Sequence, residues 1–118
     1  VIDVAYGTYD PSPTTGVNCD AVTKIADFMY MRIGNIVTVS GGVLLDSTLI
    51  NTVTSFDLQK PIASNFTTTA DAAGAANGPT YDLTSVYAVV ANDNVQVSGY
   101  STSVASVSVY LTFQYIIK

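Results

Sequence analysis

The chain contains no histidine, no glutamate and no tryptophan, and its 118 residues include a single cysteine. Without histidine it lacks the usual general base of serine and cysteine hydrolases and the commonest metal ligand. Cys19 has no second cysteine for an internal disulfide and no histidine to activate it, so we interpret it as an inert side chain. We therefore expect a protein that is not an enzyme and that binds no cofactor and no metal.

Positive charge is also scarce in the chain. Nine aspartates face four cationic side chains, and the net charge is −5 at pH 7. Because phosphate binding needs clustered Lys and Arg, we expect no nucleic-acid partner, and the same balance disfavours docking on an anionic membrane. No apolar run approaches the roughly 18 residues that cross a bilayer as a helix, so we expect no membrane insertion.

The residues that are present favour a β-sheet protein. Val, Ile, Thr, Tyr and Ser take the place of the Glu and Lys that usually cover helices. Hydrophobic residues make up 48% of the chain, and 118 residues are enough for one domain with one core, over residues 1–118. The chain begins with Val rather than Met, and we expect it to be a processed product or part of a longer chain.

The most informative local feature is a hairpin predicted for residues 28–33 and 36–45. Gly34-Asn35 between the two runs suits a two-residue turn, because Gly tolerates a positive φ at the first central position and Asn accepts one at the second. The turn sets a register in which Ile33 opposes Ile36. Side chains alternate, so one face carries Phe28, Tyr30, Val37 and Val39 with Arg32 near the turn, and the other carries Met29, Met31, Ile33 and Ile36, then Thr38 and Ser40.

Both faces of this hairpin are apolar near the turn, whereas a free-standing sandwich usually keeps one face polar. The second face therefore needs a cover, which is either another layer of the chain or a second subunit. We expect Arg32 to be structural, packing its stem and reaching a carboxylate or backbone carbonyls with its head. The residues predicted for an oligomer interface are Met29, Met31, Ile33 and Ile36.

Several other short segments read as strands. The predicted strands cover residues 48–58, 85–91, 95–100 and 107–117. The last is the clearest, because apolar and polar residues alternate with a strict period of two. Residues 70–79, rich in Ala and Gly, predict a flexible loop, although the alanines would also allow a short helical turn, and residues 22–26 are ambiguous. Short strands between turn signals predict an all-β fold, an antiparallel sandwich or jelly-roll-like knob.

Two groups of Asn and Asp side chains could bind a metal ion or act in catalysis, but each has a simpler explanation. Asn92-Asp93-Asn94 places hard ligands together, as calcium prefers, but these residues also suit tight turns. The other group is two possible carboxylate pairs, Asp46 with Asp57 and Asp71 with Asp82. Acid–base catalysis of glycosides needs a fixed separation and one raised pKa, which the sequence does not indicate. We interpret both groups as turn and solvation chemistry.

Three motifs resemble a domain found in bacteriophage fibre and related virion proteins. They read Gly-Thr-Tyr-x-Pro, Tyr-x-Arg-x-Gly-Asn-x-Val-x-Val-x-Gly and Pro-Ile-Ala-Ser-Asn-Phe, and occupy residues 7–11, 30–41 and 61–66. Residues 110–115 are similar to the closing strand of that domain. The family pattern has Leu directly before the Pro, whereas here Gln59 and Lys60 precede it.

The resemblance implies a compact β knob, commonly a homotrimer, on the tip of a longer fibre chain or on the capsid surface. It implies an exposed position on the virion beside other virion proteins, and no shared catalytic residues. In this interpretation the domain binds a host-surface glycan or protein. The alternative is a monomeric carbohydrate-binding module of a secreted protein, although such modules usually display Trp.

In both interpretations we expect recognition to use loops, because strands are committed to packing. Among the tyrosines, those predicted to be exposed are Tyr6, Tyr9, Tyr81 and Tyr100. The loop of residues 70–79 and the Asn92-Asp93-Asn94 turn are predicted to lie at one end of the domain. The predicted receptor contacts are Asn77, Tyr81, Asn92 and Asn94.

Overall fold

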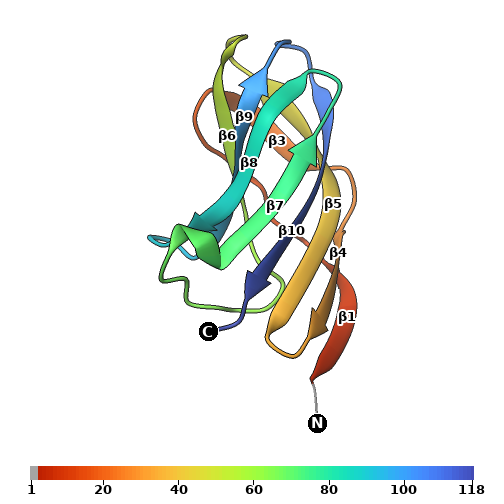
Figure 1. Ribbon diagram of the computed structural model, residues 1–118. Helices are drawn as coiled ribbons and strands as arrows, with labels where there is room; N and C mark the ends of the chain where they lie inside the picture. The colour runs from red at the N-terminus through yellow and green to blue at the C-terminus, as the bar shows by residue number, and fades with distance from the viewer. Residues whose placement is uncertain (1–2) are drawn as a thin grey trace.

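The computed structural model describes residues 3–118, apart from the side chain of Leu83. Over these residues the chain forms ten strands and one short 3-10 turn, and every strand pairing is antiparallel (Figure 1). The predicted all-β antiparallel class is therefore confirmed. The elements are β1 Val4–Tyr9, β2 Thr14–Thr15, β3 Cys19–Lys24, β4 Phe28–Ile33, β5 Ile36–Ser47, β6 Thr52–Leu58, η1 Thr69–Asp71, β7 Ala72–Asn77, β8 Tyr81–Val89, β9 Asn94–Ser101 and β10 Val107–Ile116.

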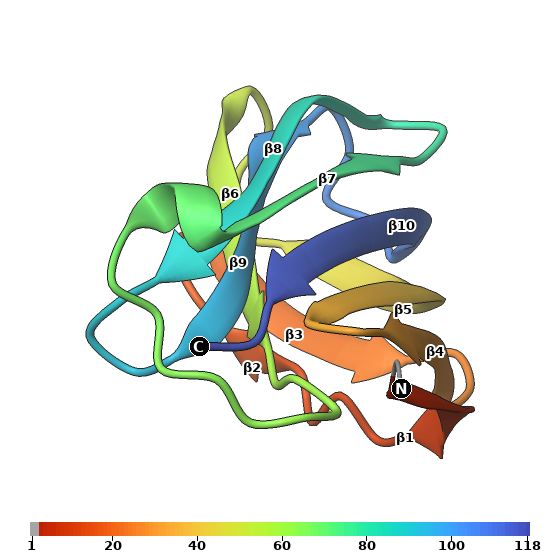
Figure 2. The ribbon, with the colours of Figure 1, turned by 60° about the horizontal axis from the view of Figure 1, so that its bottom comes forward.

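The strands form one sheet in the order β1-β4-β5-β10-β7-β8-β9-β6-β2, with β3 attached to β5. The sheet curls around the core, so that β2 lies beside β3 (Figure 2). This arrangement is consistent with a sandwich or jelly-roll-like fold. The two segments that flank Pro11 and Pro13 are both edge strands, β1 and β2, as expected for strands next to residues that cannot donate to a ladder.

The predicted hairpin is confirmed as β4 and β5, with Ile33 opposite Ile36. Gly34 has a φ of 60°, and Asn35 does not share this left-handed conformation. A positive φ at the first central residue alone is the pattern of a type II′ turn, which requires Gly at that position. The Gly34 N–H donates to the Asp3 carbonyl at 2.8 Å, so the turn also fixes the start of β1.

β5 is long because two strands share one of its edges. Its first half pairs with β4 as far as Ser40, and its second half pairs with β3 from Val43 onward. Gly41 lies between the two halves, where an added Cβ would be 2.2 Å from the Phe28 ring. Phe28 is fully buried. The absence of a side chain at Gly41 therefore lets this ring enter the core.

β10 lies in the middle of the sheet, between β5 and β7. Its inward residues are buried and its outward residues are exposed or half-buried, which confirms the predicted alternation. The inward side chains join those of β5, β6, β8 and β9 in a single hydrophobic core. The largest fully buried side chains are Tyr81, Tyr115, Phe28, Phe56, Phe113, Leu45 and Leu58.

The predicted loop of residues 70–79 is wrong. Residues Ala72–Asn77 form β7, which pairs with β10 along its length and with β8 at Ala73 and Gly74. Alanine and glycine give no alternation in hydrophobicity, but their backbone groups still complete the ladder. Other bounds also differ from the predictions, and β8 covers Tyr81–Val89 where a strand was predicted for residues 85–91. The ambiguous residues 22–26 belong mostly to β3, and β6 begins only at Thr52, after a turn.

Candidate interaction surface

The outward-pointing side chains of five neighbouring strands form one surface, called here the outer face. Strands β1, β4, β5, β10 and β7 lie side by side, and their registers align these residues in rows across the sheet. The rows are Val4, Ile33, Ile36 and Ile116; Tyr6, Met31, Thr38, Gln114 and Ala73; Thr8, Met29, Ser40, Thr112 and Ala75; and Gly42, Tyr110 and Asn77.

None of these residues is charged, although the chain as a whole carries a net charge of −5. The large apolar members are about half exposed or more: Val4 66%, Tyr6 80%, Met29 61%, Met31 51%, Ile33 54%, Ile36 51%, Tyr110 57% and Ile116 48%. The four residues predicted for an interface thus lie together on one exposed face, and their burial by a second subunit remains a prediction. Contiguous exposed apolar residues of this kind mark interaction sites.

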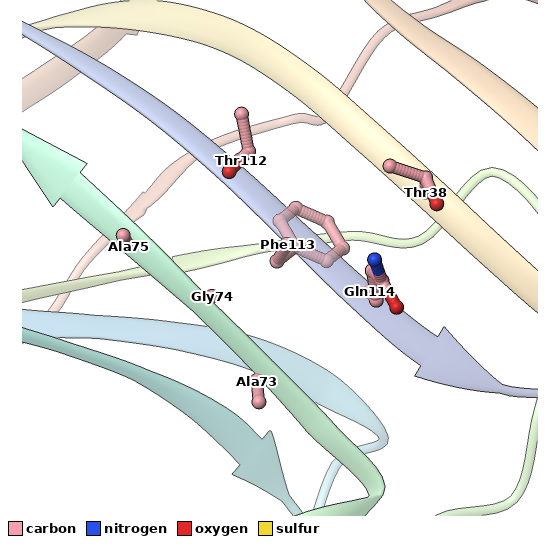
Figure 3. A pocket seen from close by; sticks show the side chains of 7 residues that line it. All are labelled: Thr38, Ala73, Gly74, Ala75, Thr112, Phe113 and Gln114. Atoms are coloured by element: carbon pink, nitrogen blue, oxygen red, sulfur yellow. The ribbon is translucent and has the colours of Figure 1, made fainter.

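The outer face is hollowed between its side chains. Large exposed side chains lie on β1, β4 and the start of β5, and we call the group Tyr6, Met29, Met31, Ile33 and Ile36 the ridge. One hollow, of about 690 Å³, lies among Tyr6, Met29 and Met31, and a smaller one, a groove of about 360 Å³ towards β7, is called the channel. Figure 3 shows Ala73 and Ala75 of β7 beside Thr112 and Gln114 of β10 and Thr38 of β5 in this groove; its lining is Thr38, Ala73, Gly74, Ala75, Thr112, Phe113 and Gln114.

Arg32 points to the inner side of the hairpin, away from the ridge. Its Nε donates to the Gly34 carbonyl at 2.8 Å, and its Nη2 lies 3.3 Å from the Asp3 carboxylate. The predicted contacts with a backbone carbonyl and a carboxylate are therefore present. The first contact holds the end of β4 to its own turn, and the second ties the hairpin to Asp3, the residue before β1.

The expectation that Tyr81 is exposed is wrong. Its side chain is only 1% exposed, and its hydroxyl donates to the Thr54 carbonyl at 2.7 Å. Burial raises the pKa of this phenol above its ordinary value. The apolar ring fills the core while the polar tip finds a backbone acceptor, as buried tyrosines usually do. Tyr81 therefore offers no aromatic face to a receptor.

Two of the other tyrosines are exposed as predicted and one is not. Tyr6 is 80% exposed and Tyr100 is 39% exposed. Tyr9 is instead half-buried, with its ring edge-on to the rings of Phe28 and Tyr30. Its hydroxyl donates to the Gln59 carbonyl at 2.9 Å. Tyr9 therefore belongs to the packing of β1 on the core.

The predicted receptor contacts do not form one cluster. Asn77 is the last residue of β7, beside the turn that leads into β8, whereas Asn92 and Asn94 lie at the turn that follows β8. These two turns are at opposite ends of β8 (Figure 1). A site made of all three residues is therefore excluded. Asn77 lies on the outer face, opposite Tyr110 of β10.

The side-chain oxygens of Asn92 and Asp93 accept hydrogen bonds from backbone N–H groups of the chain. The Asn92 side chain accepts from the Asn94 N–H at 3.1 Å, and the Asp93 carboxylate accepts from the Phe66 N–H at 2.8 Å. Asp93 has a φ of 56°, a conformation that Asp tolerates in turns. Over the described residues, no group of three or more His, Cys, Asp or Glu side chains is placed to hold a metal ion.

Asp71 has the opposite environment to that of a catalytic acid. Its carboxylate contacts the Lys118 ammonium at 2.8 Å and accepts from the N–H groups of Thr67 and Thr68. These interactions, the Lys118 hydrogen bond foremost, hold the pKa of this carboxyl well below its ordinary value.

The thiol of Cys19 is half-buried, and burial raises its pKa, which disfavours a reactive thiolate.

Sequence reasoning missed the contributions of β1 and β7 to the outer face. The alternation of Val4, Tyr6 and Thr8 could have revealed the first, since these residues extend the rows of Ile33, Met31 and Met29. The contribution of β7 has no signal in the sequence, because Ala73 and Ala75 belong to a strand that the sequence does not distinguish from a loop.

Comparisons with protein-family models, with curated proteins and with solved structures find no match to this chain. Among the described residues, no helix has the length and apolar character needed to cross a membrane.

Proposed function

We propose that this chain is a non-enzymatic structural domain that assembles as a homotrimer through its outer face, as a knob of a phage fibre or capsid-surface protein. The observation that carries the proposal is the charge-free outer face, on which the predicted interface residues stand exposed on adjacent strands. The resemblance of three sequence motifs to virion fibre domains supports the setting. The proposed location is the virion surface, beside other virion proteins.

The outer face offers several apolar side chains to a contact with another copy. Five strands at about 4.8 Å spacing make a strip roughly 24 Å wide, and a specific interface uses about 800 Å² per partner. Burying the exposed half of one Met or Ile side chain contributes on the order of 1 kcal/mol. Several such side chains on a surface without charges give a contact that avoids the cost of desolvating ions.

Attachment to a host glycan or protein belongs to the same proposal and uses the surfaces that assembly leaves free. Asn77, Asn92 and Asn94 remain proposed contacts, now at two separate ends of β8. One specific observation favours the alternative, a monomeric carbohydrate-binding module. A groove of about 690 Å³ lies beside the exposed ring of Tyr6, with the hydroxyls of Thr8, Thr38 and Ser40 along it. A flat aromatic beside hydroxyl groups is suited to a neutral sugar.

Mass measurement in native solution tests the proposal. We expect a species of three times the 12.4 kDa chain mass at micromolar concentration. Met31→Asp should convert it to monomer, with a dissociation constant raised at least about a hundredfold, because an unpaired charge would be buried. Leu49→Asp is the matched control, since Leu49 is 60% exposed in the turn between β5 and β6, outside the outer face.

A folded wild-type monomer at this concentration would contradict the proposal. If that monomer bound neutral glycans and Tyr6→Ala abolished the binding, the carbohydrate-binding alternative would replace it.

A further inference from the structure

We propose that the open edge of β1 accepts an extended segment of another protein as an added antiparallel strand, and that this segment carries a Lys or Arg at its N-terminal end. β1 is the first strand in the order of the sheet and lies outermost beside β4 (Figure 1). The backbone groups at its edge point along the sheet, whereas the side chains of the outer face point out of it. The inference therefore concerns a second surface and does not depend on the proposed function.

Half of the backbone groups of β1 face this open edge. The Asp3 carbonyl accepts from the Gly34 N–H at 2.8 Å, so Asp3 faces the β4–β5 hairpin. Consecutive residues of a strand direct their N–H and C=O groups to opposite sides. The residues of β1 whose backbone groups turn away from β4 are therefore Val4, Tyr6 and Thr8.

The register of the hairpin gives the same assignment. Ile33 opposite Ile36 across a two-residue turn is a hydrogen-bonded pair, so Ile33 faces β5 and the next residue, Arg32, faces β1. Arg32 lies opposite Ala5, which leaves the alternate residues of β1 to face outward. Within the described part of the chain, no hydrogen bond reaches the backbone of the outward-facing residues, and all of them are exposed: Val4, Tyr6 and Thr8.

The other edge strands that the structure describes are protected, and β1 is not. β2 has only two residues and directly follows Pro13. β3 contains a bulge, carries Asp20 and Lys24, and lies beside β2. Short length, proline, bulges and charges are the usual means of keeping an edge from pairing with other strands. β1 has six residues without a charge, a proline or a bulge, so its edge is open to an added strand.

Charge at the two ends of β1 indicates what kind of segment fits. After the C-terminal end of β1, Asp10 and Asp27 share the single ammonium of Lys24, and both carboxylates are about half exposed. This group keeps one negative charge without a partner. Before the N-terminal end, Asp3 already has the Arg32 guanidinium at 3.3 Å. An antiparallel segment brings its N-terminal end beside Asp10, so a Lys or Arg at that end complements the charge.

A second copy of β1 fits this edge less well. The antiparallel register that uses every free group of both copies places Tyr6 opposite the same residue of the second copy. Asp3 of each copy then lies diagonally across from Asp10 of the other, at both ends of the pairing. Like charges at such positions destabilise a strand pair, and each copy also carries a net charge of −5. The edge therefore favours a cationic segment of a different protein.

A labelled synthetic peptide tests the inference on the whole protein. The probe is the heptapeptide Lys-Thr-Val-Thr-Val-Thr-Val with blocked ends, and fluorescence anisotropy measures its dissociation constant. The control peptide has the same composition with the Lys moved to the C-terminal end, where it would meet the Asp3–Arg32 pair. We expect saturable binding of the first peptide and weaker binding of the second.

Two pairs of protein variants separate the backbone contribution from the charge contribution. Thr8→Pro removes an N–H that faces the open edge and makes no bond to β4, and it should weaken binding at least about tenfold. Thr8→Ala keeps this N–H and should bind more tightly than Thr8→Pro. Asp10→Asn should weaken binding of the first peptide about two- to fivefold, as expected for an exposed ion pair. Asp82→Asn, which removes an exposed carboxylate on β8, is its control.

The outcomes decide the inference without reference to self-assembly. Absence of binding by the wild type, or equal binding by Thr8→Pro and Thr8→Ala with both shown to be folded by circular dichroism, would overturn it. Equal affinity for the two peptides, or an equal effect of Asp10→Asn and Asp82→Asn, would also overturn it. If Thr8→Pro instead lowers the mass of the native protein and Thr8→Ala does not, a second copy occupies the edge and the inference is wrong.

Discussion

At the scale of single residues, two glycines meet requirements that no other residue type could meet. Gly34 provides the positive φ of the hairpin turn, and Gly41 leaves the space that the Phe28 ring occupies. The sequence predicted the first, because Gly-Asn between two apolar runs is a local signal. It could not predict the second, because the contact between Gly41 and Phe28 depends on how β5 bends in the folded sheet.

The turn assignment predicts the effect of replacing Gly34. Gly34→Val should destabilise the fold by about 1 to 3 kcal/mol, because a β-branched residue is strained at a φ of 60°. Urea unfolding of the protein measures the change. Asn35→Ala is the control, since Asn35 lies outside the left-handed region. Equal stability of Gly34→Val and wild type would show that the turn adopts another conformation in solution.

The environment of Asp71 predicts how the stability of the fold changes at acidic pH. Its pKa is lowered in the folded state, by the Lys118 hydrogen bond first, below the ordinary value of 3.8. The ionised carboxylate therefore stabilises the fold above about pH 3.8, and this contribution is lost as the pH falls towards the folded-state pKa. Thermal melting from neutral pH to about pH 2 should show this loss in the wild type.

In Asp71→Asn the melting temperature should be lower at neutral pH and should fall less on acidification. Asp82→Asn removes an exposed carboxylate and serves as the control. Identical pH profiles for Asp71→Asn and wild type would mean that the Lys118 contact contributes nothing to stability.

At the scale of elements, the periodic strands were predictable and the others were not. β4, β5 and β10 carry alternating apolar residues, so their existence and inward faces followed from the sequence. β7 carries only Ala, Gly and Asn, and its identity as a strand depends on pairing with β10, far away in the chain. Tyr81 was misplaced for the same reason, since a residue after a supposed loop would be exposed.

The segment between β6 and η1 has no regular structure and is fastened to β10 by hydrogen bonds. The Tyr115 hydroxyl donates to the Ile62 carbonyl at 2.7 Å and accepts from the Ile62 N–H at 3.1 Å. The Ser64 hydroxyl donates to the Ile116 carbonyl at 2.8 Å. Burial raises the pKa of Tyr115 to about 12, so its hydroxyl keeps its proton throughout the physiological range.

We expect removal of the Tyr115 hydroxyl to loosen the segment between β6 and η1. Tyr115→Phe should cost about 1 to 3 kcal/mol, because both Ile62 backbone groups lose their partner in a partly buried place. Hydrogen exchange of the Ile62 amide should accelerate. Tyr100→Phe is the control, as Tyr100 is 39% exposed on β9. Unchanged exchange at Ile62 in Tyr115→Phe would show that other contacts hold the segment.

At the scale of the whole molecule, charge is distributed unevenly. The ion pairs Lys24–Asp10, Arg32–Asp3 and Lys118–Asp71 all lie outside the rows of the outer face. The sequence already indicated that the outer side of the hairpin needed a cover. It could not indicate that β10 and β7 extend this face, because that depends on pairings between distant segments.

This distribution predicts how assembly responds to salt. Contacts through a charge-free face should not weaken when the salt concentration rises from about 50 mM to about 500 mM, because no attraction between ions is screened. Salt also screens the repulsion between the negatively charged copies. The dissociation constant at high salt should therefore be equal to or lower than the dissociation constant at low salt. Light scattering across a protein dilution series measures the dissociation constant at both salt concentrations. Dissociation at high salt would show that ion pairs hold the copies together.

The central position of β10 also has a consequence for the order of events during synthesis. β10 is made after the nine other strands described here, yet it separates β5 from β7 and pairs with both. Until it emerges, the chain holds two incomplete half-sheets with open edges, and such edges invite pairing with other chains. Pairings between segments this far apart fold slowly, on the order of milliseconds to seconds. The outward residues of β5 and β7 are joined into one face only when β10 enters the sheet, so the surface proposed for self-assembly is incomplete until β10 has been synthesised.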